Sequence, residues 1–175
     1  MNTHIWALIP LAILVTSCKD RNKPTVERFV SGDLSIGITK NGELKTVFDT
    51  LNAMDLKIAA MHGFVYNANL PADSLHSLQI YLNTKPYINT GGWSASVYYH
   101  EPDRAIRIVS NLFEMDSSNQ MDFLYTIDSL QLVDKQSDTK AMVLKVPIGQ
   151  EKYWLNELKK QSVVKWAELN RILPD

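Results

Sequence analysis

Few residues of this chain have the types and the spacing that metal or catalytic chemistry requires. A protein zinc site needs several histidine, cysteine or carboxylate ligands close together, but His62, His76 and His100 each stand alone. The acidic stretch 116–122 lacks the alternating ligands and final glutamate of a calcium-binding loop, and a helix cap explains it better. The sequence therefore predicts no metal site.

Nucleophilic and phosphate chemistry have no better support. Gly92, Trp93 and Ser94 begin like a nucleophile elbow, but the second glycine of the pattern Gly-x-Ser-x-Gly is missing. The chain has no glycine-rich loop of the kind that holds phosphates, and its single cysteine is Cys18. We therefore expect a protein that is not an enzyme and that uses no cofactor.

Tyrosine and tryptophan are concentrated in residues 81–99, around a loop with two glycines. Both residue types are over-represented in binding hot spots, because they combine a large contact area with a polar tip. Neighbouring strand residues point to opposite faces, so one tyrosine of the pair 98–99 is expected in the core. The alternative is a core cluster beside a solvated loop. The candidate partner-binding residues are Tyr87, Trp93, Tyr98 and Tyr99.

The start of the chain predicts export. Ile5 to Val15 is an apolar run of 11 residues, which is too short to span a bilayer of about 30 Å and typical of a signal peptide. The run ends in Val15-Thr16-Ser17-Cys18, which resembles the lipobox of bacterial lipoproteins. That resemblance implies a signal peptide at residues 1–17 and lipidation of Cys18, with fatty acids such as palmitate.

Residues 18–32 are polar and charged, as expected of a tether between a membrane and a folded domain. The residue after Cys18 is Lys19 rather than aspartate, which by the same resemblance favours the outer membrane. The Lys19-Asp20 pair is also similar to the surface-export signals of Bacteroidetes lipoproteins. We expect a protein of the cell envelope, lipid-anchored to the outer membrane, on its periplasmic or its outer face. A formal charge of −1 argues against nucleic acid as a partner.

The folded part repeats one order of elements. Alternating apolar residues and helical periodicity predict strand, helix, strand, strand, helix and strand within residues 34–100, and the same order again within 105–170. In the first stretch, two short strands flank His62-Gly63. Asn41-Gly42 is a strong hairpin signal, but the longer helical periodicity after it favours a helix with Asn41 as its N-cap.

The two stretches also share a weak sequence similarity, which aligns Phe48–Leu56 with Leu124–Leu132. The order β-α-β-β-α-β is that of the ferredoxin-like fold. We therefore predict an α+β protein of two tandem ferredoxin-like units, residues 33–101 and 102–175, with helices packed on antiparallel sheet.

Two local resemblances suggest functions. Lys40–Ile58 looks like the strand–helix–strand pattern of ACT domains, which bind amino acids, often between paired domains. The segment from Val143 to Asn170 is similar to the end of subtilase propeptides, which inhibit proteases with the tail that follows; here the tail is RILPD. The proline that those propeptides carry after the glutamate is Leu169 in this chain.

The sequence thus predicts a cell-envelope lipoprotein that acts as a non-catalytic protein-interaction module, a class that includes immunity and inhibitor proteins. Its partners would be the membrane, through Cys18, and another envelope or secreted protein. The alternative is an amino-acid sensor of ACT type. An interaction module should show an aromatic patch without a deep pocket, whereas a sensor should show a pocket between the two units.

Overall fold

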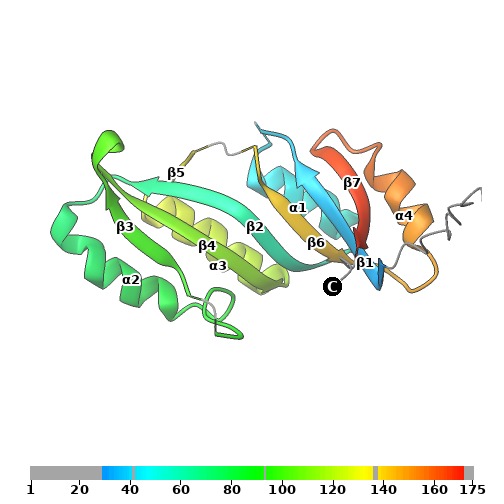
Figure 1. Ribbon diagram of the computed structural model, residues 1–175, viewed down its shortest axis with the longest axis horizontal. Coiled ribbons are helices and arrows are strands. Elements are labelled where there is room, and N and C mark those ends of the chain that lie inside the picture. Colours follow the sequence, from blue (N-terminus) through cyan, green and yellow to red (C-terminus); the bar gives the residue numbers. More distant parts are fainter. Residues whose placement is uncertain (1–28, 41, 93, 136–137, 172–175) are drawn as a thin grey trace, which may run out of the picture.

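The computed structural model describes residues 29–40, 42–92, 94–135 and 138–171. Within these ranges, four α-helices pack on a seven-stranded antiparallel sheet (Figure 1). The prediction of a mixed α+β protein is confirmed. The predicted signal peptide, Cys18, the tether up to residue 28, and the predicted helix cap Asn41 lie outside the described residues.

The strands and helices follow one another with few irregular segments. The strands are β1 (Phe29–Ile38), β2 (Lys57–Ala68), β3 (Ser96–His100), β4 (Ala105–Met115), β5 (Val133–Asp134), β6 (Ala141–Lys145) and β7 (Val164–Arg171). The helices are α1 (Leu44–Ala53), α2 (Leu75–Asn83), α3 (Ser117–Ser129) and α4 (Glu151–Leu158), with short 3-10 turns η1 (Ala72–Ser74) and η2 (Glu101–Asp103). The sheet order is β3-β4-β2-β6-β1-β7, and β5 pairs with β2.

Strand β2 is the longest strand and joins both ends of the sheet. The two short strands expected around His62-Gly63 are one continuous strand, so that prediction is wrong. The register shifts between Met61 and Phe64, which marks a β-bulge. Gly63 has a φ of +73°, and a Cβ added to it would lie 2.3 Å from the Thr139 carbonyl oxygen. The glycine therefore forms a bulge against a neighbouring backbone instead of a hairpin turn.

The pairing of the strands divides the molecule into two lobes. In the terminal lobe, formed by residues 29–62 and 138–171, the strand order is β2-β6-β1-β7. In the central lobe, formed by residues 64–135, the order is β3-β4-β2-β5. The sheet does not confirm tandem units at 33–101 and 102–175, because β1 pairs with β6 and β7 from the other half of the chain.

The ends of α1 and α3 have the same backbone turn. After α1, the Leu56 N–H donates to the Leu51 carbonyl at 3.1 Å, and Asp55 has a φ of 54°. After α3, the Leu132 N–H donates to the Ile127 carbonyl at 2.8 Å, and Gln131 has a φ of 48°. These residues correspond in the aligned segments 48–56 and 124–132, so the weak sequence similarity coincides with a shared local structure.

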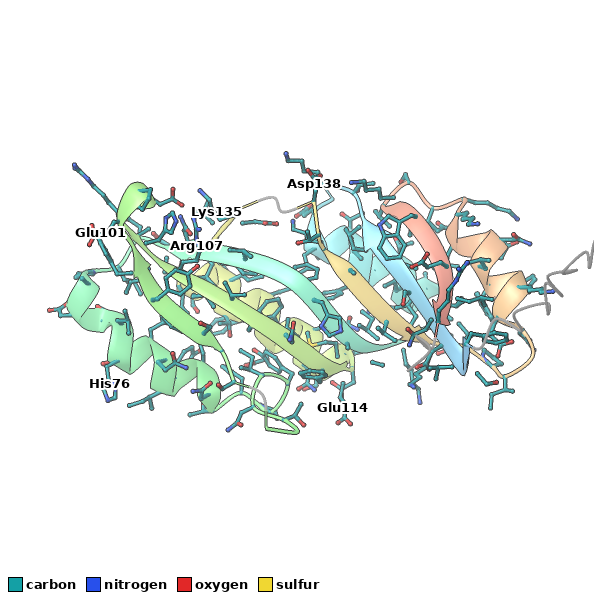
Figure 2. The ribbon with its side chains drawn as sticks, viewed as in Figure 1. His76, Glu101, Arg107, Glu114, Lys135 and Asp138 are labelled. Carbon is teal, nitrogen blue, oxygen red and sulfur yellow. The ribbon has the colours of Figure 1, made fainter. Side chains whose placement is uncertain are left out.

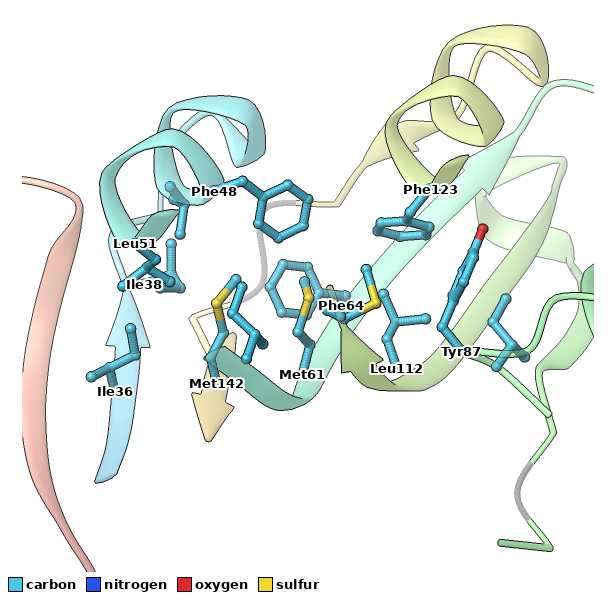
Figure 3. Close-up of a cluster of buried hydrophobic side chains, with 14 of the residues drawn as sticks. Ile36, Ile38, Phe48, Leu51, Met61, Phe64, Tyr87, Leu112, Phe123 and Met142 are labelled. Atoms are coloured by element: carbon cyan, nitrogen blue, oxygen red, sulfur yellow. The ribbon is translucent and has the colours of Figure 1, made fainter. Parts of the chain in front are cut away.

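One continuous hydrophobic core connects the lobes (Figure 3). Phe48 on α1 and Phe123 on α3 lie above the two parts of the sheet, and Met61, Phe64 and Met142 lie below them. Each of these side chains is at most 3% exposed. Burying a side chain of this size contributes about 1.5–3 kcal/mol, so the seam between the lobes is part of what stabilises the fold.

Candidate functional site

The predicted aromatic residues do not form a common surface. Tyr87 is 1% exposed and packs edge-on against Phe123, with ring centroids 5.8 Å apart. Tyr99 is half-buried and packs against the core. Tyr98, on the opposite face of β3, is 40% exposed. Trp93 lies outside the described residues. Tyr87 is therefore a core residue, and Tyr98 is the one exposed residue among the three that the structure describes.

Tyr87 has a structural role at the base of its loop. Its hydroxyl donates to Asp122 Oδ2 at 2.7 Å, and Lys85 Nζ lies 2.9 Å from the same carboxylate oxygen. Burial raises the pKa of the Tyr87 hydroxyl. Desolvation opposes the charge of Asp122, but the hydrogen bonds from Tyr87 and Lys85 outweigh it and lower the pKa of that carboxyl group. This cluster fastens the loop 84–92 to α3.

Among the described residues, a cavity of about 690 Å³ lies where the two lobes meet. Its lining comes from within segments 52–59 and 113–120, together with Thr90 and Lys145. Cavities of this size commonly hold small organic molecules. This pocket, between the lobes and at the ends of β4 and β6, is the candidate site.

The floor of the pocket is apolar because residues at the edge of the hydrophobic core form it. Leu56, Ile58 and Met115 line it and are at most 4% exposed. Ile58 and Met115 are paired residues of β2 and β4. The loop 84–92 closes this edge, since the Phe113 N–H donates to the Tyr87 carbonyl at 2.9 Å. A ligand in the pocket would therefore contact apolar groups held by paired strands.

A pair of amide side chains forms the polar wall. Asn52 Nδ2, at the end of α1, donates to Gln120 Oε1 on α3 at 2.8 Å. Gln120 Nε2 in turn donates to the Met115 carbonyl at 2.8 Å, and the side chain is 4% exposed. Amides carry both donors and acceptors, so this wall joins the two lobes and can also bind a polar group.

Charged residues of both signs surround the pocket. Lys57 on β2 lies directly opposite Lys145 on β6, and such like-charged cross-strand pairs are unfavourable. Lys145 Nζ is 2.6 Å from Asp33 Oδ1 on β1, which offsets one of the two charges. On the other side, Asp116 caps α3, since its Oδ1 accepts from the Asn119 N–H at 2.8 Å. The expected capping role within 116–122 is confirmed for Asp116.

Glu114 has an unusual backbone conformation at the edge of the pocket. Its φ is 49°, in the left-handed region that non-glycine residues rarely adopt, and it lies at the end of β4 (Figure 2). Its carbonyl accepts from the Asp116 N–H at 2.9 Å and from Asn119 Nδ2 at 2.8 Å. This turn brings the start of α3 to the pocket, and strained residues of this kind cluster at functional sites.

His62 and His100 each have a polar partner in the fold. His62 Nδ1 lies 3.1 Å from Asn111 Oδ1, and His100 Nδ1 accepts from the Asp103 N–H at 3.3 Å. In the part of the chain that the structure describes, no three or more His, Cys, Asp or Glu side chains gather in a way that could hold a metal ion. None of the described helices is long and apolar enough to cross a membrane.

Comparison with known proteins finds no matching family model, no matching curated protein and no matching solved structure. The fold and the site define the protein as a two-lobed α+β protein with a pocket at the junction of its lobes. The sequence did not single out Asn52, Glu114 or Gln120 as site residues. Asn52 is distant in the chain from Glu114 and Gln120, and the pairing of β2 with β4 brings the three residues to the same pocket.

Proposed function

We propose that this protein is a lipid-anchored cell-envelope protein that binds a small organic ligand, without catalysis, in the pocket between its lobes. The observation that carries the proposal is the pocket itself, with its apolar floor and its charged and amide-lined edge. The dispersal of the predicted aromatic residues supports the same choice. Of the two hypotheses drawn from the sequence, the sensor is therefore favoured over the protein-interaction module.

We also propose that each lobe is a ferredoxin-like unit and that the two arose by duplication followed by an exchange of halves. Each lobe contains strand–helix–strand–strand–helix–strand, with its first strand between its third and fourth. The shared turn after α1 and α3 supports the duplication. In this arrangement the ACT-like segment Lys40–Ile58 supplies Asn52 and residues 55–58 of the pocket.

Amino acids are the first ligands to test. A free amino acid carries an ammonium group, a carboxylate and a side chain, and the pocket offers groups that suit each of them. Glu114 and Asp55 can accept from an ammonium group, Lys57 can pair with a carboxylate, and the floor at Ile58 suits an apolar side chain. The mixed charge of the edge thus favours a zwitterion over a simple anion or cation.

The test is a thermal-shift and calorimetric screen of the full-length chain against the standard amino acids. Ligand at about 100 times its Kd should stabilise the protein by about 2.7 kcal/mol. Ala59→Phe should fill the pocket and abolish the shift, because Ala59 lines it. The control is Val65→Phe, a half-buried residue farther along β2 that is not part of the lining. Absence of saturable binding, or equal binding by both variants, would rule the proposal out.

The anchor is tested separately. The proposed lipidation depends on Cys18 in the sequence Val15-Thr16-Ser17-Cys18. We expect Cys18→Ser to abolish incorporation of labelled palmitate and to move the protein from the membrane fraction to the soluble fraction. Retention of the variant in the membrane fraction would contradict the lipoprotein proposal but would leave ligand binding in the pocket untouched.

One observation keeps protein binding as a second candidate function. Tyr98 on β3 and Trp166 on β7 are 40% and 38% exposed, and both lie on the sheet face that points away from the core. Exposed aromatic residues on a sheet face are typical of interfaces. Crosslinking in intact cells, compared between the wild type and Tyr98→Ala with Trp166→Ala, distinguishes this candidate from ligand binding.

A further inference from the structure

A second polar site lies at the far end of the central lobe, around the η2 turn. Tyr98, Arg107 and Asn67 occupy paired positions on the adjacent strands β3, β4 and β2. All three alternate with core residues, so they lie on the sheet face that points away from the core. Asp103 from η2 and Lys135, next to β5, complete the cluster (Figure 2 labels Arg107 and Lys135).

The donors of this cluster converge on a single oxygen atom. Asp103 Oδ2 lies 2.7 Å from Asn67 Nδ2, 2.5 Å from Arg107 Nη2 and 3.0 Å from Lys135 Nζ. His100 Nδ1 is 3.5 Å from the same oxygen and accepts from the Asp103 N–H. Hydrogen bonds from Asn67, Lys135 and Arg107 lower the pKa of the Asp103 carboxyl group, so it remains ionised.

The Asp103 carboxylate does not use all the N–H donors of Arg107 and Lys135. A guanidinium group has five N–H donors and an ammonium group has three. Arg107 Nη2 donates to Asp103, and Arg107 Nε donates to Asn67 Oδ1 at 3.3 Å. Arg107 and Lys135 carry two positive charges against the one of Asp103. The other charged residues of the turn, Glu101 and Arg104, carry one formal charge of each sign.

We propose that this cluster is a binding site for one oxyanion group, a carboxylate or a phosphate, held between Arg107 and Lys135. The planar guanidinium group matches such groups with two parallel hydrogen bonds, and Lys135 is 39% exposed, so its ammonium group is accessible. Tyr98, beside Arg107 on the same face, adds a contact surface for the rest of the ligand. The site is separate from the pocket between the lobes and does not depend on the proposed function of that pocket.

The test is calorimetry of the full-length chain in nonionic detergent at low ionic strength, with inorganic phosphate and with citrate as probes. We expect saturable binding that weakens with added salt. A preference for phosphate identifies a phosphorylated ligand, a preference for citrate identifies a carboxylate ligand, and similar affinities identify a general oxyanion site; each of these results supports the proposal. Absence of saturable binding by either probe would overturn it.

Two variants change the affinity in opposite directions. Lys135→Gln removes one charge-assisted hydrogen bond and should weaken binding about tenfold. Asp103→Asn removes the internal competitor and should tighten binding about tenfold, with a larger thermal shift on adding phosphate. In a purely structural cluster, Asp103→Asn would lower stability without tightening binding, and that result would refute the site even if binding by the wild type were seen.

The chain offers a matched control. Lys45 Nζ and Asp49 Oδ2 form an exposed ion pair at 2.6 Å on α1, away from the cluster. Lys45→Gln and Asp49→Asn make the same changes in net charge, so they should leave the affinity for both probes unchanged. Equal effects of Lys135→Gln and Lys45→Gln would mean that the anions respond only to net charge, and the proposed site would be wrong.

Discussion

Asp55 and Glu114 both line the pocket with left-handed backbone angles, but the surrounding structure accounts for them differently. Asp55 ends a helix in the same way as Gln131, which lies outside the pocket, so its conformation is an ordinary helix-end turn. Glu114 is the penultimate residue of β4, and its turn directs α3 toward the pocket. Neither aspartate nor glutamate predicts a positive φ by its residue type alone, so the sequence could not indicate these angles.

Glycine substitutions at positions 114 and 131 distinguish effects on fold stability from effects on ligand binding. We expect Glu114→Gly and Gln131→Gly each to stabilise the fold by about 1 kcal/mol, because glycine adopts the left-handed region without a steric cost. Thermal unfolding should show both gains, about 3 °C each. Only Glu114→Gly should weaken ligand binding in the pocket. A loss of stability in either variant would show that its carboxylate or amide group has a structural role.

Glu151 gives a prediction for acid stability. Its Oε1 accepts from the Gly32 N–H at 2.9 Å and from Ser31 Oγ at 3.3 Å, linking α4 to β1. Backbone hydrogen bonds, its own N–H first and then that of Gly32, lower the pKa of this carboxyl group in the folded protein. A lowered folded-state pKa stabilises the protein above the unfolded pKa, and the effect is lost as the pH falls.

We therefore expect Glu151→Gln to be less stable than the wild type at pH 7, with the difference shrinking as the pH falls below about 4.3. Urea unfolding at a series of pH values measures this. Two parallel stability curves from pH 7 to pH 3 would contradict the role given to the Glu151 carboxylate.

At the scale of elements, the sequence predicted most strands and helices but not the course of β2. His62-Gly63 lies between two apolar runs, and a glycine there is compatible with either a turn or a bulge. Which one forms depends on partners that come much later in the chain, since β6 pairs with the first part of β2 and β5 with the second. Local periodicity contains no information about those partners. It therefore could not distinguish the predicted tandem units from the observed strand pairing.

The bulge can be tested at Gly63. We expect Gly63→Ala to cost more than about 2 kcal/mol, since the new methyl group would meet the Thr139 carbonyl oxygen at 2.3 Å and φ is +73°. The control is Gly92→Ala, where φ is +84° but no atom lies within 4 Å. That variant isolates the backbone strain, which costs about 1 kcal/mol. Equal unfolding free energies for the two variants would mean that β2 and residue 139 can separate without cost.

At the scale of the whole molecule, the position of the pocket depends on which segments of the chain form each lobe. The terminal lobe contains the two ends of the described chain, and the central lobe comes from the segment 64–135 between them. The pocket forms where α1 and β2 of one lobe meet α3 and β4 of the other. The sequence indicated the order of strands and helices, and a pocket between units only under the alternative of an amino-acid sensor. The segments that form each lobe and the residues that line the pocket depend on the strand pairing.

The shared core predicts that the lobes unfold together. Leu112, in the central lobe, is fully buried, and Leu112→Ala should cost about 2–5 kcal/mol. Among the described residues, the tryptophans are Trp154 and Trp166, both in the terminal lobe. In a Trp93→Phe background, we expect Leu112→Ala to shift the urea midpoint of tryptophan fluorescence as far as that of circular dichroism. An unchanged fluorescence midpoint would show that the lobes unfold independently.

The pairing of Phe29 with Arg171 places the two ends of the described chain together. The first and last described residues lie side by side in the terminal lobe, while the central lobe forms the other end of the long axis (Figure 1). A chain held by a lipid at Cys18 is therefore attached by its terminal lobe. If the proposed lipid anchor at Cys18 is correct, the Asp103 cluster lies on the lobe that does not carry the attachment and stays open to molecules that approach the anchored protein.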